Sequence, residues 1–98
     1  MNKIELLPKD IMFENEHYQL GMWVTAFSRL CIGYKHILDR NETLFSVCVE
    51  PERAPISISE TKGWFLNGLV GNAASVDDAC EELLDYIEKN KEDFKVEI

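Results

Sequence analysis

The sequence predicts a small α+β sandwich, in which an antiparallel sheet of three to four strands carries two helices packed on one face. Apolar residues recur at the spacing of a helix face in residues 20–38 and 75–89. Between them lie short segments of strand-like composition, separated by turn residues. The expected order is therefore helix, three strands, helix, with short extended segments at both termini. At this length we expect residues 1–98 to form one domain.

The two ends of the chain are expected to be extended. Residues 3–7 predict a short first strand that ends at Pro8, and residues 94–98 predict a short last strand. Residues 11–19 favour neither helix nor strand, because an apolar start is followed by a polar run.

Residues 20–38 fit either one helix or two strands. In a helix, one face would be wholly apolar. That face would hold Leu20, Trp23, Val24, Phe27, Leu30, Cys31, Tyr34 and Leu38. The aromatic and β-branched content favours strands, and Gly21 and Gly33 each cost a helix about 1 kcal/mol relative to alanine. Because periodicity over this length outweighs propensity, the prediction is a helix, with two strands as the alternative.

Three strands are expected in the middle of the chain. They are residues 44–49, 56–59 and 64–70. Two prolines in residues 51–55 mark the first turn, Gly63 marks the second, and Gly71 closes the last strand. Consecutive strands joined by short turns predict an antiparallel sheet.

Residues 75–89 form the best-defined element, a helix with one apolar side and one acidic side. Ser75 is placed to cap this helix by accepting a hydrogen bond from the amide of Asp78. The apolar side holds Val76, Ala79, Cys80, Leu83, Leu84 and Ile87. The acidic side holds Asp77, Asp78, Glu81, Glu82, Asp85 and Glu88. Lys89 follows Asp85 by one turn and is expected to pair with it.

The predicted element order over residues 20–89 resembles that of the double-stranded-RNA-binding domain and of related antitoxins of the HicB type. The resemblance is one of topology, and it implies the same α+β arrangement. In RNA-binding members the second helix opens with lysines that contact phosphates, whereas this chain has Asp77 and Asp78 there. The resemblance thus implies the fold and counts against RNA binding.

The charge of the chain is concentrated near its C-terminus. Of the net charge of −8, residues 1–74 contribute −2 (nine acids, seven bases) and residues 75–98 contribute −6 (nine acids, three bases). Such a surface repels phosphate backbones and attracts basic proteins. We therefore expect no direct nucleic-acid binding.

No pattern in the sequence predicts catalysis or a bound metal. His17 is expected in a loop and His36 on the polar side of the first helix, without the neighbours that nucleophilic catalysis needs. Cys31, Cys48 and Cys80 are widely spaced in apolar surroundings, so they are expected to be reduced, buried thiols. No catalytic residue, metal or cofactor is predicted.

The acidic helix leads to the main functional hypothesis. We expect a non-enzymatic protein-binding module, an inhibitor such as an immunity protein, an antitoxin or a phage inhibitor, whose six helix acids bind a basic protein such as a nuclease toxin. The alternative is an accessory or structural subunit that forms a homodimer through its sheet. With neither the apolar run of a signal peptide nor a segment of about 20 apolar residues, a cytoplasmic location without membrane contact is expected.

Overall fold

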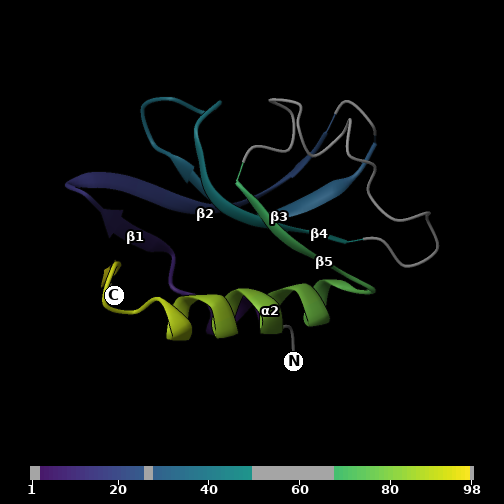
Figure 1. Cartoon of the computed structure of the whole chain (residues 1–98). Coiled ribbons are helices and arrows are strands. Elements are labelled where there is room, and N and C mark those ends of the chain that lie inside the picture. Colours follow the sequence, from purple (N-terminus) through teal and green to yellow (C-terminus); the bar gives the residue numbers. More distant parts are fainter. Residues whose placement is uncertain (1–2, 26–27, 50–67, 98) are drawn as a thin grey trace.

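The computed structural model describes residues 3–25, 28–49 and 68–97. They form a curled, mixed sheet of five strands, shaped like half a barrel, with a short sixth strand at one edge and one helix packed on it (Figure 1). The elements are η1 (Lys3–Leu6), β1 (Asp10–Phe13), β2 (Glu16–Val24), β3 (Leu30–His36), β4 (Thr43–Val49), β5 (Leu69–Ala73), α2 (Val76–Lys89) and β6 (Lys95–Glu97). The strand order is β5-β4-β3-β2-β1-β6. The α+β class is thus confirmed, but the arrangement differs from the predicted one.

The helix predicted for residues 20–38 is wrong, because strands β2 and β3 occupy this stretch. The two strands pair antiparallel. Tyr18 lies opposite His36 at one end of the ladder, and Val24 lies opposite Leu30 at the other. Residues 31–34 of β3 are all buried. A strand covered on both faces has no alternation of apolar and polar residues, so its pattern also fits helical spacing. The strand propensity of the aromatic and β-branched side chains was therefore the better guide.

Only one α-helix, α2, packs on the sheet among the described residues. The predicted pair of helices on one face is wrong, because residues 20–38, which were to form the first of them, belong to β2 and β3. The element order also departs from that of the double-stranded-RNA-binding domain, since strands stand where its first helix would be, and the resemblance does not hold.

A two-residue turn joins β1 and β2. It lies in residues 11–19, for which the sequence favours neither helix nor strand. Phe13 pairs with Glu16 across the hairpin, and the turn residues Glu14 and Asn15 have φ angles of 50° and 66°. Positive φ at both central residues is the backbone conformation that matches the right-handed twist of antiparallel strands. This hairpin brings Asp10 and His17 onto neighbouring strands.

Strand β4 confirms the predicted strand at residues 44–49, but its next neighbour is parallel rather than antiparallel. Strand β5 pairs with β4 in the parallel direction and continues through Gly71 and Asn72, beyond its predicted end. A parallel neighbour requires a long connection between the two strands. The predicted strand at residues 56–59, the turns at 51–55 and 61–63, and residues 64–67 of the third predicted strand lie outside the described residues.

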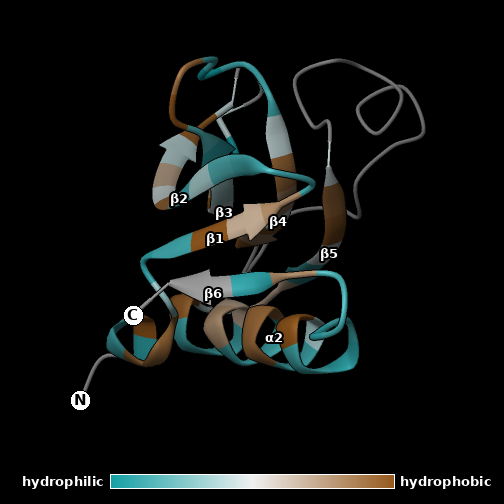
Figure 2. Ribbon diagram, turned by 90° about the vertical axis from the view of Figure 1, so that its left-hand side faces the viewer, coloured by the Kyte–Doolittle hydropathy of each residue, from teal (hydrophilic) through white to brown (hydrophobic). Residues whose placement is uncertain are grey.

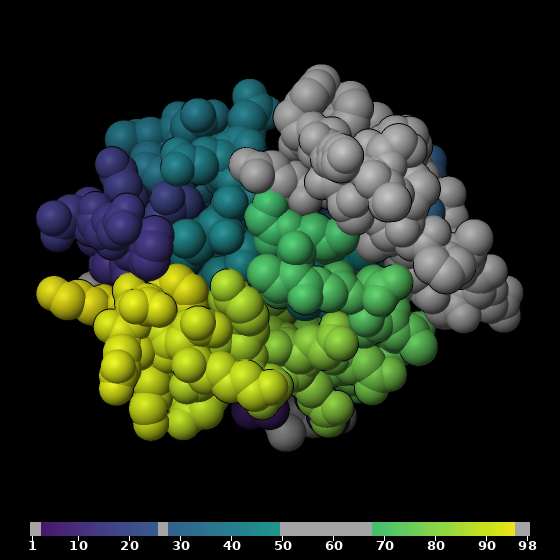
Figure 3. Space-filling model, in the orientation of Figure 1, coloured from purple at the N-terminus to yellow at the C-terminus, as the bar shows by residue number. Residues whose placement is uncertain are grey.

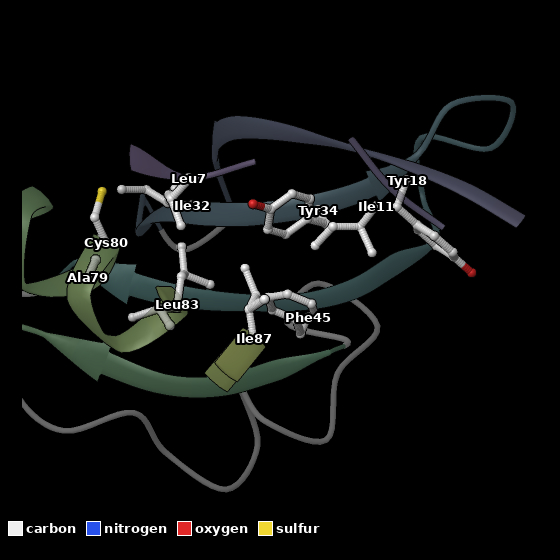
Figure 4. Packing of buried hydrophobic residues seen from close by; sticks show 11 residues of the cluster. Leu7, Ile11, Tyr18, Ile32, Tyr34, Phe45, Ala79, Cys80, Leu83 and Ile87 are labelled. Atoms are coloured by element: carbon white, nitrogen blue, oxygen red, sulfur yellow. The ribbon is translucent and has the colours of Figure 1, made fainter. Parts of the chain in front are cut away.

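The main core lies between α2 and the face of the sheet that α2 covers. The predicted apolar side of α2 is confirmed, since Ala79, Cys80, Leu83 and Ile87 are buried and Val76 and Leu84 pack against the same core. Figure 4 shows Leu83 and Ile87 near Phe45 of β4, with Ile32 and Tyr34 of β3 beyond. Burying a side chain such as Leu83 contributes about 1.5–3 kcal/mol. This packing turns the acidic side of α2 to solvent (Figure 2).

The chain ends pack beside α2. Residues 3–7 do not form the predicted strand: η1 is a 3-10 helix, Leu7 is buried, and Pro8 accepts a hydrogen bond from the hydroxyl of Tyr34 at 2.7 Å. The short last strand is confirmed as β6, which pairs antiparallel with β1.

Candidate acidic interface

Helix α2 begins where the sequence predicts. The amide of Asp78 donates a hydrogen bond to Ser75 Oγ at 3.1 Å, which satisfies one amide that the first turn leaves open. Asp77 and Asp78 lie in that first turn, where the positive end of the helix dipole favours carboxylates.

Lys3 neutralises one side of the acidic surface. Its backbone amide donates to Asp77 Oδ1 at 3.2 Å, and its ammonium pairs with Glu81 Oε1. The hydrogen bond to Glu81 raises the pKa of Lys3 above its usual value. Asp77 and Glu81 therefore bind η1 to α2, a contact between residues more than 70 positions apart that the sequence did not reveal.

Four of the six predicted acids surround one open hollow with a volume of about 430 Å³, here called the acidic hollow. It is lined by Ala73, Ala74, Asp78, Glu81, Glu82 and Asp85. Ala73 ends β5 and Ala74 follows it. Both have only a methyl side chain, so they leave space in front of the carboxylates. The structure thus concentrates the negative charge of α2 toward β5.

The other two predicted acids lie outside the acidic hollow. Asp77 borders a separate depression with Met22, Ser75 and Val76. Glu88 lies further along α2, and its Oε1 is 3.2 Å from the ammonium of Lys91.

Glu82 is an acid of the hollow that lies against strand β5. Its carboxylate sits above Gly71 of β5, such that a Cβ built on Gly71 would be 3.5 Å from Glu82 Oε2. Burial raises the pKa of Glu82, and the nearby charge of Asp78 raises it further. Both effects disfavour the ionised carboxylate, and a cation in the hollow would offset them.

A smaller groove, with a volume of about 200 Å³, adjoins the acidic hollow and shares Glu82 and Asp85 with it. It lies on the side where α2 is next to β5 (Figure 3). It is lined by Val47, Val70, Glu82, Asp85, Tyr86 and Lys89. The ammonium of Lys89 lies 2.8 Å from Asp85 Oδ2, which confirms the predicted pair, and this hydrogen bond raises the pKa of Lys89. The groove therefore combines apolar side chains with two carboxylates, of which Asp85 already pairs with the ammonium of Lys89.

The structure corrects the predicted position of His36, which is buried at the end of β3 instead of lying on a helix. Its Nδ1 lies 3.0 Å from the amide of Leu38 and 3.2 Å from that of Asp39. Amides can only donate, so Nδ1 accepts, and Nε2 carries the proton that is donated to Glu16 Oε2 at 2.6 Å. Both ring nitrogens are thus engaged in structural hydrogen bonds, which leaves neither for general-base catalysis.

His17 is likewise in a strand rather than in a loop. It lies in β2, and its Nε2 is 2.7 Å from Asp10 Oδ1. The neighbouring Tyr18 donates to Glu42 Oε1 at 3.2 Å, and burial together with this bond raises the pKa of Tyr18 to about 12. These contacts join β1, β2 and the turn before β4, and sequence spacing alone did not indicate them.

All three cysteines are buried thiols, as predicted. Burial raises the pKa of Cys80, which packs in the main core. Within residues 3–25, 28–49 and 68–97, no three His, Cys, Asp or Glu side chains are grouped to hold a metal ion.

No helix in the described part of the chain has both the length and the hydropathy needed to cross a bilayer. No protein-family model matches this chain, and neither curated proteins nor solved structures give a significant match.

Proposed function

We propose that this protein is a non-enzymatic inhibitor that binds a basic protein through the acidic hollow and the adjoining groove. The observation that carries the proposal is the convergence of Asp78, Glu82 and Asp85 beside β5. Like charges one helical turn apart destabilise a helix by about 0.2–0.5 kcal/mol per pair. A cationic partner would remove this repulsion on binding.

The groove suggests how a basic side chain would be held. A lysine or arginine could lay its aliphatic stem on Val70 and Tyr86 and place its charged end between Glu82 and Asp85. Lys89 already occupies part of this position in the unbound chain. A partner would displace it or bind beside it.

The partner class that this surface favours is a protein that itself binds nucleic acid, such as a nuclease toxin. Such proteins present basic surfaces to phosphate backbones, and carboxylates in a row would occupy the positions of phosphates. Opposite charges also speed association, to about 10⁸ M⁻¹s⁻¹ or more at low salt. Binding of this kind would block the nucleic-acid site directly.

The test is affinity capture from the native host with three forms of the chain. The first is the wild type, and the second carries Asp78→Asn, Glu82→Gln and Asp85→Asn. The third is the matched control, in which three exposed acids outside the acidic hollow are neutralised by Glu5→Gln, Glu92→Gln and Asp93→Asn. We expect the wild type and the control to retain one stoichiometric basic protein that is released as salt rises, and the acidic-hollow variant to lose it. Equal capture by all three forms, or no captured basic protein, would contradict the proposal.

A second candidate function, self-association as an accessory subunit, has one observation in its favour. Strand β5 is an edge strand of the described sheet, and the side chain of its Val70 is 42% exposed. Pairing of two copies along β5 would bring the acids of both grooves together, so salt would strengthen the dimer. Salt would weaken a complex with a basic protein. Sedimentation at low and high salt therefore separates the two candidates.

A further inference from the structure

Cys31 and Cys48 form a pair of buried thiols on neighbouring strands. They are register partners of β3 and β4, and their sulfur atoms are 3.0 Å apart. Their exposed fractions are 1% and 0%, and Trp23 and Leu69 pack against them. They form a cluster separate from the main core, to which Cys80 belongs.

We propose that Cys31 and Cys48 are an oxidisable pair that closes a cross-strand disulfide bond when the folded protein meets a small peroxide. This inference is independent of the proposed inhibitor function.

The backbone already places the two residues at a suitable separation. Directly opposed residues of antiparallel strands have Cα atoms about 4.5–5.5 Å apart, and disulfides span Cα separations of about 4.4–6.8 Å. The sulfur atoms need to approach by only about 1 Å to reach bonding distance. Rotation of the two side chains supplies such a movement without a change of register.

The chemical step balances with hydrogen peroxide as the oxidant. One thiol loses its proton, and its thiolate attacks a peroxide oxygen; the O–O bond breaks and a sulfenic acid forms. The other oxygen leaves as hydroxide and takes up the proton released by that thiol, which gives water. The second sulfur then attacks the sulfenic sulfur, and the hydroxyl group leaves as water with the second thiol proton. The two cysteines lose two electrons in total, and the peroxide gains them. The burial of the pair favours this small oxidant over a bulky one such as glutathione disulfide.

The bond would tie together two central strands of the sheet. Both β3 and β4 contribute to the main core, through Ile32, Tyr34, Phe45 and Val47. A cross-link between positions 17 residues apart reduces the entropy of the unfolded chain. We expect the oxidised protein to melt about 10 °C higher than the reduced one.

The test treats the folded wild-type protein with hydrogen peroxide, alkylates all remaining thiols after unfolding, and maps the peptides without reduction. The expected result is one linked pair, Cys31 with Cys48, a mass loss of two hydrogen atoms, and an alkylated Cys80. Three alkylated cysteines would overturn the proposal. So would a link that includes Cys80, or oxidation that stops at isolated sulfenic or sulfinic acids.

Two variants sharpen the result. Cys80→Ala leaves the pair as the only thiols, so peroxide should remove all titratable thiol from the folded chain, and a reductant should restore it. Cys48→Ser should abolish both the link and the rise in Tm. A Tm rise that survives in Cys48→Ser would contradict the proposed bond. If either variant fails to fold, the peptide map of the wild type decides.

Discussion

Gly21 of β2 and Gly33 of β3 face each other as register partners, yet only one of them has room for a side chain. A Cβ on Gly33 would lie 2.3 Å from the carbonyl oxygen of Phe45, whereas a Cβ on Gly21 would meet no atom of the described residues within 4 Å. The close approach of β4 to β3 therefore requires glycine at position 33 and not at position 21.

This difference predicts that alanine is tolerated at one of these two glycines and not at the other. Gly33→Ala should destabilise the fold by about 3 kcal/mol or more, because the new methyl group meets backbone atoms that cannot move without breaking the β3–β4 pairing. Gly21→Ala should change the free energy of unfolding by less than about 0.5 kcal/mol. Urea unfolding of both variants measures the difference. Equal losses of unfolding free energy in the two variants would show that β3 and β4 do not approach each other at Gly33 as described.

The cap of α2 gives a second prediction. Ser75→Ala removes the acceptor for the amide of Asp78 and should lower the free energy of unfolding by about 1 kcal/mol. Ser75→Asp keeps an acceptor at the same position and should retain most of the stability. The same loss in both variants would mean that the side chain of Ser75 does not act as a cap.

Glu82 gives a prediction that depends on pH. Its pKa in the folded state is raised above that of the unfolded chain, so the native state binds the proton more readily. Stability therefore falls as pH rises between the unfolded and the folded pKa, and the loss is complete above both. Glu82→Gln should thus stabilise the protein at neutral pH, by less than about 1 kcal/mol because the group is largely exposed.

The stabilising effect of Glu82→Gln should disappear at about pH 3.5, where the carboxyl group is protonated in both states. Thermal unfolding at the two pH values measures this change, with Glu92→Gln as a control on an exposed acid. A variant that is less stable than the wild type at neutral pH would contradict the described desolvation of Glu82.

Lys89 gives a prediction about binding. Lys89→Gln removes the ammonium that contacts Asp85, so it exposes a carboxylate of the groove and makes the net charge one unit more negative. We expect binding of a lysine-rich probe peptide to tighten two- to tenfold, roughly 0.4–1.4 kcal/mol. Lys91→Gln removes a charge that pairs with Glu88 outside the groove and should have a smaller effect. Fluorescence anisotropy with labelled peptide compares the two; equal effects would argue against a role for the groove.

The elements that could be predicted from the sequence are those specified by local contacts. The start, length and apolar side of α2 follow from Ser75 and from a single helical period, and the strand at residues 44–49 follows from its composition. The pairs between Lys89 and Asp85 and between Ser75 and Asp78 are also local.

The features that could not be predicted depend on contacts between distant residues. Burial of residues 31–34 on both faces of the sheet removed the alternation that marks a strand. The parallel pairing of β5 with β4 joins strands some 20 residues apart, and Lys3 reaches Asp77 and Glu81 from the other end of the chain. No local pattern distinguishes the two acids that contact Lys3 from the other four. The sequence therefore predicts six equivalent carboxylates, whereas the fold neutralises part of this charge with Lys3.

Binding of a basic protein at the acidic hollow is tested most directly by association kinetics with the protein retained in the capture experiment. Stopped-flow rate constants for the wild type and for the variant with Asp78→Asn, Glu82→Gln and Asp85→Asn would be measured at low and moderate salt. We predict a wild-type rate constant that falls steeply with salt, and a variant at least tenfold slower at low salt with little salt dependence. Equal rate constants for the two proteins, or rates that salt leaves unchanged, would contradict the account.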